Sequence, residues 1–220
     1  MLKRNAIILI SIICLVVLIL PIHAVFGADN AWSTTGPYGV RITGLSIHPE
    51  NNQIIFATTP DGSVPVYKSI DGGLTWASSS TGLPSASGEI FDIVFDPDNS
   101  NILYLPYLAG IYRSVDGGKN WELKSTAVID DSEYRIRAWS FDISPLDGTL
   151  FAGAYGGWAG LHGGVFRSKD RGETWVQVAD ETETAGIISA LAVSPSAPHI
   201  IYAGGYLGGG IFKSTDGGET

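Results

Sequence analysis

The chain has 220 residues and carries 22 acidic against 13 basic side chains, so its net charge is −9 at pH 7. This acidic balance argues against nucleic acid and anionic membrane surfaces as partners, because both carry negative charge themselves. One Cys and one Met occur in the whole chain. No disulfide framework can therefore form, and the fold must be stabilised by packing.

Residues 1–28 differ in composition from the rest of the chain. Lys3 and Arg4 precede an apolar run from Ala6 to Leu20, which is followed by Pro21 and a stretch rich in small residues. A charged start, an apolar run of about fifteen residues and small residues after it are typical of a secretory signal. The alternative is an uncleaved anchor, although a spanning helix needs about 20 apolar residues. We therefore expect an exported protein whose domain covers residues 29–220, with any membrane contact made through an uncleaved N-terminal segment.

One pattern of about ten residues is repeated four times in the rest of the chain. An aromatic residue and Lys or Arg precede Ser-x-Asp, a Gly follows two residues later, and the three complete copies end at a Trp. The serines are spaced by 45, 54 and 46 residues: Ser69, Ser114, Ser168 and Ser214. Repeats of 40 to 50 residues that each contain about four short strands indicate an all-β propeller of four-stranded antiparallel blades.

Each copy predicts a strand, a tight turn and a second strand. The Asp is expected to accept hydrogen bonds from N–H groups two residues further on, and the second Gly suits a left-handed backbone. The Trp offers a large apolar area for packing against the next unit. The first Gly of the turn is Arg171 in the third copy, so that position must accept a side chain. The residues assigned to this structural role are Ser69, Asp71, Gly73 and Trp76; Ser114, Asp116, Gly118 and Trp121; Ser168, Asp170, Gly172 and Trp175; and Ser214, Asp216 and Gly218.

These residues resemble the BNR or Asp-box repeat, whose pattern is Ser-x-Asp-x-Gly-x-Thr-Trp. The first and third copies keep every position, and the second has Asn120 in place of Thr. Proteins with such repeats include sialidases, xyloglucanase-type glycoside hydrolases, sortilin-like receptors and photosystem II assembly-factor-like proteins. The resemblance implies a scaffold and no particular reaction. It also implies that these turns lie on the face away from the ligand site.

The two ends of the chain leave the number of blades open. The stretch from Trp32 to Gly36 is similar to the strand that starts at Trp76, and Thr220 stops one position before an expected Trp. The chain is either a fragment of a larger propeller or a four-blade ring that the N-terminal strand closes. An end inside a turn exposes a sheet edge, which favours the fragment.

A propeller blade places its second-to-third-strand loops, and the loops between blades, on the face opposite the Ser-x-Asp turns. Both loops next to the third repeat are long, at residues 124–138 and 153–164. Long loops on a rigid scaffold tend to carry binding function. The candidate ligand-binding residues are Tyr107, Arg135, Arg137, Tyr155, Trp158, His162 and Tyr206. Trp158 could instead fold back over its own loop. His162 has no His or Cys partner at ligand spacing, so no metal site is predicted.

The loop before the third repeat also carries the weak catalytic candidates Asp130, Asp131 and Glu133. Glycoside hydrolysis needs two carboxylates roughly 5 to 10 Å apart, and a solvated acidic loop is the alternative. The segment from Tyr134 to Ile136 resembles the Tyr/Phe-Arg-Ile-Pro motif of sialidases. Arg137 replaces the Pro, and no arginine triad can be assembled, so sialidase activity is not expected.

These observations predict an exported binding or assembly scaffold that takes a protein or polysaccharide ligand on the loop face. The alternative is a secreted glycoside hydrolase of the xyloglucanase-like propeller type. A structural role within a surface protein is a third possibility. No cofactor is predicted. A pair of facing carboxylates, one with a raised pKa, would favour the enzyme, and a shallow aromatic face without that pair would favour binding.

Overall fold

The computed structural model describes residues 33–87, 90–107, 110–129, 131–156, 162–180, 184, 186–206 and 208–219. The chain divides into two units, Met1–Thr34 and Thr35–Thr220, and every sheet lies in the second. The predicted signal segment, Asp130 and Trp158 lie outside the described residues, so the predictions for them stay predictions. Among the described residues, no helix is long and apolar enough to cross a membrane.

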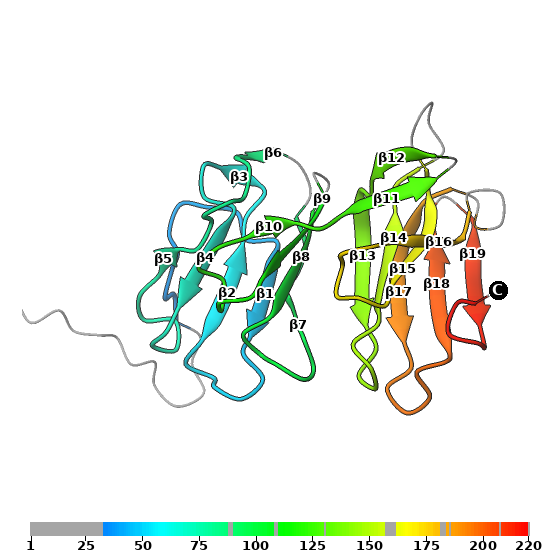
Figure 1. Ribbon diagram of the computed structural model, residues 1–220. Helices are drawn as coiled ribbons and strands as arrows, with labels where there is room; N and C mark the ends of the chain where they lie inside the picture. The colour runs from blue at the N-terminus through cyan, green and yellow to red at the C-terminus, as the bar shows by residue number, and fades with distance from the viewer. Residues whose placement is uncertain are drawn as a thin grey trace, which may run out of the picture. The chain divides into compact units, whose positions relative to one another are not determined.

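The fold is all-β, and its main sheets follow one another along the chain as four antiparallel blades (Figure 1). Blade one contains β1 (Gly44–Ile47), β2 (Ile55–Thr58), β4 (Val66–Ser69) and β5 (Ala77–Ser78). Blade two contains β7 (Val94–Phe95), β8 (Leu103–Tyr107), β9 (Gly110–Ser114) and β10 (Glu122–Leu123). Blade three contains β13 (Ala138–Ile143), β14 (Leu150–Ala154), β15 (Gly164–Ser168) and β16 (Val176–Ala179). The described residues of blade four form β17 (Ile188–Val193), β18 (Ile201–Gly205) and β19 (Gly210–Ser214).

The four blades share one register between their second and third strands. The serine that opens each turn pairs with the first residue of β2, β8, β14 or β18: Ile55 with Ser69, Leu103 with Ser114, Leu150 with Ser168, and Ile201 with Ser214. Because side chains alternate between the two sides of a strand, this common register puts equivalent residues on the same side of every blade. Positions in different blades can therefore be compared one by one.

Hydrogen bonds confirm the predicted division into two faces. The Ser-x-Asp turns lie against the turns between the first and second strands, since the N–H groups of Gly72, Gly117 and Gly217 donate to carbonyls of Gln53, Asn101 and His199. On the other face, β3 (Asp61–Gly62) pairs with β6 (Ala86–Ser87), which joins an internal loop of blade one to the loop that leads to blade two. We call this second side the loop face.

The turn of blade two shows how the repeated residues work. The Ser114 hydroxyl donates to Asp116 Oδ1 at 2.8 Å and accepts the Gly118 N–H at 2.9 Å. Asp116 in turn accepts the N–H of Asn120 at 2.9 Å and its side-chain amide at 2.7 Å. The carboxylate thus reaches four residues along the chain, not two as predicted. Asn120 replaces Thr here without loss, because its amide donates where the hydroxyls of Thr75 and Thr174 do in their turns.

These bonds hold the turn carboxylates in the ionised form. Hydrogen bonds from the Thr75 hydroxyl and N–H lower the pKa of Asp71 to about 2. Burial raises the pKa of Asp116, but the donors on Asn120 and Ser114 outweigh it and lower that pKa to about 2. The pKa of Asp170 is lowered by the same balance, with burial opposed by Thr174 and Ser168.

The tryptophan of each complete turn is bonded to the chain that precedes its blade. The indole N–H of Trp121 donates to the Ser79 carbonyl at 2.7 Å, and that of Trp175 donates to the Lys124 carbonyl. Ser79 and Lys124 each lie three residues after the tryptophan of the preceding blade. The indole of Trp76 donates to Thr35 at 3.2 Å, and Thr35 lies three residues after Trp32. The segment at Thr35 therefore takes the place that the outer strand of a preceding blade would occupy, as its sequence predicts.

The basic residue before each of the first three turn serines also joins neighbouring blades. Lys68 Nζ donates to the Gly117 carbonyl at 2.8 Å, Arg113 Nη1 to the Arg171 carbonyl at 2.8 Å, and Arg167 Nη1 to the Gly217 carbonyl at 3.0 Å. Each bond runs from the third strand of one blade to the turn of the next. The recurring Lys or Arg of the sequence pattern is therefore a link between blades.

The long connection before blade three is more regular than its sequence analysis assumed. The sequence predicts a loop at residues 124–138. In the structure, β11 (Thr126–Ile129) and β12 (Ser132–Arg135) form a hairpin in which Ile129 pairs with Ser132. Asp131, which precedes β12, adopts a positive φ of 61°, a backbone conformation common in hairpin turns. The extra length is thus folded into a two-stranded sheet, which fixes the direction of the side chains on β12.

Candidate functional site

Three aromatic rings stack in a row on the loop face of blades three and four. Trp139, near the start of β13, lies 5.3 Å from the Tyr155 ring and 5.6 Å from the Tyr206 ring, with interplanar angles of 24° and 29°. Tyr155 follows β14 directly and Tyr206 follows β18 directly. We call these three side chains the aromatic ledge. They come together because the start of β13 and the ends of β14 and β18 all lie at the loop face of two neighbouring blades.

The ledge leaves aromatic surface open to a ligand. Its ring centroids are farther apart than the ~4 Å of direct carbon contact, so the rings are offset and part of each face is uncovered. Trp139 and Tyr155 are half-buried, which restricts their orientation, and Tyr206 is 45% exposed. An ordered and partly exposed row of rings is suited to stacking against flat apolar groups.

A hollow of about 520 Å³ adjoins this ledge and shares Tyr155 with it. Residues of β12 and of the segment that follows it form one wall, and His162 and Phe166 belong to blade three: the lining is Glu133, Tyr134, Arg135, Ile136, Arg137, Tyr155, His162 and Phe166. The Tyr134 and His162 rings meet edge to face at 4.2 Å. The two loops that the sequence marks as long therefore meet at one site.

The polar groups of the hollow are mainly donors. Arg135 and Arg137 are both exposed, and the described residues place no carboxylate within ion-pair distance of either guanidinium. Glu133 supplies the carboxylate in the lining. Two guanidinium groups and one carboxylate can hydrogen-bond the hydroxyl groups of a ligand whose apolar face lies on the rings.

Several predicted residues fall elsewhere. Asp131 lies at the tip of the β11–β12 hairpin and is not part of the hollow lining. Tyr107 was predicted on the ligand face, but its ring is 1% exposed and packs in the core of blade two. It is therefore not available for stacking. Asp130 and Trp158 lie outside the described residues. Within the part of the chain that the structure describes, no group of His, Cys, Asp or Glu is suited to a metal ion.

Sequence analysis missed Trp139, which forms the centre of the ledge. The sequence did offer an indication of a separate role for Trp139, because Trp76, Trp121 and Trp175 belong to the repeated turn and Trp139 does not. A large aromatic residue outside the structural pattern needs another explanation. Pairing of Ala138 with Ala154 places Trp139 beside Tyr155 only after the two strands are aligned, so the sequence could not reveal the contact.

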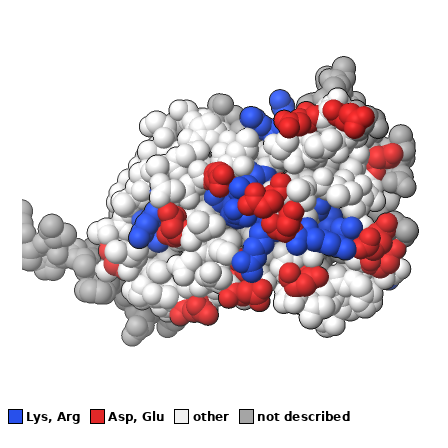
Figure 2. All heavy atoms as spheres, in the orientation of Figure 1, with Lys and Arg blue, Asp and Glu red and all other residues white. Residues whose placement is uncertain are grey.

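Charge on the molecular surface is mixed. Figure 2 shows Lys and Arg side chains interspersed with Asp and Glu on the face drawn, in agreement with ion pairs such as Arg113 with Glu173 at 2.7 Å and Lys124 with Glu173 at 2.8 Å. These pairs join blades two and three and lower the pKa of Glu173, chiefly through the hydrogen bond from Lys124. The negative net charge is therefore not gathered into one binding patch on that face.

No known family model matches the chain. A xyloglucanase of Hypocrea jecorina (strain QM6a) is 29% identical in an alignment of 151 residues, and the match covers 63% of this chain and 18% of that protein. Solved structures with a similar fold include an ancestral GH74 enzyme (TM-score 0.63, 22% identity, 86% of this chain and 25% of that one) and a GH74 enzyme of Niastella koreensis (TM-score 0.57, 24% identity, 81% and 29%). A GH74 xyloglucanase of Xanthomonas campestris is also similar (TM-score 0.58, 17% identity, 83% and 30%).

The chain spans about a fifth of the length of the curated relative and about a quarter of the first of these structures. The TM-scores of 0.57 to 0.63 show that the solved structures share the fold of this chain. The repeated register, the links between blades and these likenesses together identify the fold as a series of β-propeller blades.

Proposed function

We propose that this chain forms part of an exported, glycoside-hydrolase-like propeller of the xyloglucanase type, in which its blades three and four bind the polysaccharide. The observation that carries this proposal is the aromatic ledge of Tyr155, Trp139 and Tyr206 beside a hollow with two exposed guanidinium groups. Sugar rings offer C–H faces that pack on aromatic rings and hydroxyl groups that accept hydrogen bonds from Arg. The similarity to a xyloglucanase supports a polysaccharide over a protein ligand.

The described residues support binding more strongly than catalysis. Hydrolysis of a glycosidic bond by two carboxylates needs both on the walls of one cleft. Within the part of the chain that the structure describes, the hollow is lined by one carboxylate, that of Glu133. We therefore assign to this chain the positioning of the polysaccharide, and to the whole protein the hydrolytic reaction.

The experiment is titration of the chain with xyloglucan in an isothermal calorimeter, with two matched tyrosine variants. Tyr206 is 45% exposed on the ledge directly after β18, and Tyr202 is 42% exposed within β18. We expect Tyr206→Ala to weaken binding by about tenfold, the effect of losing roughly 1.4 kcal/mol, and Tyr202→Ala to leave it unchanged. Equal effects of both changes, or no binding of xyloglucan by the unaltered chain, would refute the proposal.

A reducing-end assay on xyloglucan separates binding from hydrolysis. Binding without release of reducing ends supports the role assigned to these blades alone. Release that Glu133→Gln abolishes, with binding retained, would show that the chain assembles its own catalytic pair and would overturn the division of roles.

A further inference from the structure

A carboxylate joins two basic side chains at the junction between blades two and three. Glu173 directly follows the second glycine of its turn, and it accepts from Arg113 Nη2 at 2.7 Å and from Lys124 Nζ at 2.8 Å. Arg113 is the basic residue before the turn serine of blade two. The bond to Glu173 raises the pKa of Lys124, so this pairing stabilises the ammonium group.

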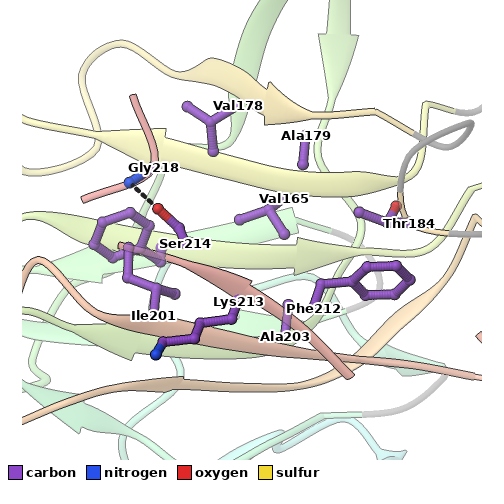
Figure 3. Close-up of a pocket in the computed structure, with 11 residues that line it drawn as sticks. Val165, Val178, Ala179, Thr184, Ile201, Ala203, Phe212, Lys213, Ser214 and Gly218 are labelled. Carbon is purple, nitrogen blue, oxygen red and sulfur yellow. Dashed lines mark hydrogen bonds between the residues drawn. The ribbon is translucent and has the colours of Figure 1, made fainter. Parts of the chain in front are cut away.

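The junction between blades three and four has the same arrangement. In the turn of blade four, the Gly218 N–H donates to the Ser214 hydroxyl (Figure 3), and the residue after this second glycine is Glu219. Glu219 Oε1 lies 3.0 Å from Arg167 Nη1 and 2.6 Å from Lys169 Nζ. At both junctions, therefore, one carboxylate lies between two cations.

The junction between blades one and two lacks this carboxylate. The residue after the second glycine of blade two is Lys119, and the basic residue before the turn serine of blade one is Lys68. Lys68 Nζ donates to the Gly117 carbonyl at 2.8 Å and lies 5.2 Å from the centre of the Phe56 ring. Among the described residues, no carboxylate lies within ion-pair distance of either lysine.

The two unpaired lysines act on each other. Burial lowers the pKa of Lys68, and the positive charge of Lys119 lowers it further. The Asp116 carboxylate opposes both effects, but its oxygens already accept hydrogen bonds from Ser114 and Asn120. An anion close to both ammonium groups would stabilise their charged forms.

Both lysines line one hollow of about 460 Å³ beside β5, which we call the lysine hollow. Its lining includes Ile70, which is 71% exposed, and the half-buried Trp76. The indole N–H of Trp76 already has acceptors, so the ring offers apolar surface. Ser78 adds an exposed hydroxyl group. The lysine hollow can therefore contact an acid group, C–H groups and hydroxyl groups of one ligand.

We propose that the lysine hollow binds a uronic acid, a sugar that carries a carboxylate. The carboxylate lies between the ammonium groups of Lys68 and Lys119, as the carboxylates of Glu173 and Glu219 lie between cations at the other two junctions. The C–H face of the sugar ring packs on Trp76. A simple anion such as acetate leaves this apolar wall uncovered and binds more weakly.

The test is calorimetric titration of the unaltered chain with trigalacturonate, its methyl ester and acetate at equal ionic strength. We expect trigalacturonate to bind at least about tenfold more tightly than the ester or acetate. The variant Lys119→Glu places at this junction the residue that the other two carry. It is expected to pair with Lys68, to bind trigalacturonate at least about tenfold more weakly, and to keep or raise the urea midpoint of the unaltered chain.

Lys213→Gln is the matched control. Lys213 is also exposed, but it belongs to blade four and lies over the Tyr202 ring, so this change should leave the affinity for trigalacturonate unaltered. Monomeric galacturonate distinguishes two sources of the acid. Binding as tight as that of the trimer identifies a free sugar acid, and weaker binding identifies a unit within a chain.

Equal binding of trigalacturonate and its ester would show that the carboxylate is not recognised, and equal binding of acetate would show a simple anion site. Either result would overturn the proposal. Absence of binding at millimolar trigalacturonate, or full affinity in a folded Lys119→Glu variant, would overturn it as well. Ile70 and Lys119 belong to the Ser-x-Asp turns, and the aromatic ledge lies on the loop face. The xyloglucan titration therefore tests a different site.

Discussion

Replacing Ser114 by Ala tests whether the repeated turns stabilise the blades as the geometry indicates. The Ser114 side chain is 1% exposed, and its hydroxyl accepts the buried N–H of Gly118 at 2.9 Å while donating to Asp116 at 2.8 Å. A hydrogen bond to a charged group contributes about 1.5 to 3 kcal/mol, and a buried N–H left without an acceptor costs about 1 to 3 kcal/mol. Because these terms overlap, we expect Ser114→Ala to lower the free energy of unfolding by about 2 to 4 kcal/mol.

Ser214→Ala is the matched control, since the Ser214 hydroxyl makes the same bonds at 2.7 Å to Asp216 and 2.9 Å to the Gly218 N–H. Ser214 is half-buried, so water can replace part of what the hydroxyl provides. We expect a loss of less than about 1.5 kcal/mol there. Urea unfolding followed by tryptophan fluorescence measures both values. A loss below about 0.5 kcal/mol for Ser114→Ala, or equal losses at the two positions, would refute the argument from burial.

Two further predictions concern charge and backbone strain in the turns. The folded-state pKa of Asp71 and of Asp116 is about 2, below the ordinary value near 3.9, so their stabilisation is fully present above about pH 4 and is lost as the pH falls towards 2. The urea midpoint of the unaltered chain should therefore fall as the pH is lowered from about 4 to about 2, and the midpoint of Asp116→Asn should fall less. If the two midpoints fell in parallel with pH, the stabilisation would not come from the Asp116 carboxylate. Arg171 has a φ of 61°, where Gly is unstrained, so Arg171→Gly should unfold with a free energy about 1 to 2 kcal/mol higher than Arg171→Ala. Both variants lose the contacts of the guanidinium with Asp96 and Asp98, and identical unfolding free energies would exclude strain at this position.

The blade architecture could be predicted from sequence because the residues that form each turn are close together in the chain. Ser69, Asp71 and Gly73 close a turn within a few residues, and that contact needs no knowledge of the remaining chain. The bonds between blades could not be predicted in the same way. Lys68 recurs as Arg113 and Arg167, but its acceptor, the Gly117 carbonyl, lies 49 residues further along and is identified only when the blades are placed side by side.

The candidate site illustrates the same limit. Loop length pointed to the loops around blade three, and Tyr155, His162, Arg135 and Arg137 from these loops line one hollow, while their role in binding stays a prediction. The pairing of residues 126–129 with 132–135 had a sequence signal, because only two residues separate the two short runs. Tyr107 had no such signal: it ends a strand as Tyr155 follows one, and only packing shows that its ring is buried.

The lowered pKa values of the turn carboxylates show that these groups cannot serve as general acids. A general acid for glycoside hydrolysis must hold its proton near neutral pH, which requires a raised pKa. Hydrogen bonds from Thr75 and Asn120 do the opposite at Asp71 and Asp116 and lower each pKa to about 2. These groups are ionised wherever the turns are formed, and their oxygens are occupied by N–H, amide and hydroxyl donors of their own turn. Asp71 and Asp116 are thus excluded as proton donors. In the proposed function, the carboxylate offered to a polysaccharide is instead that of Glu133, which lines the hollow on the opposite face.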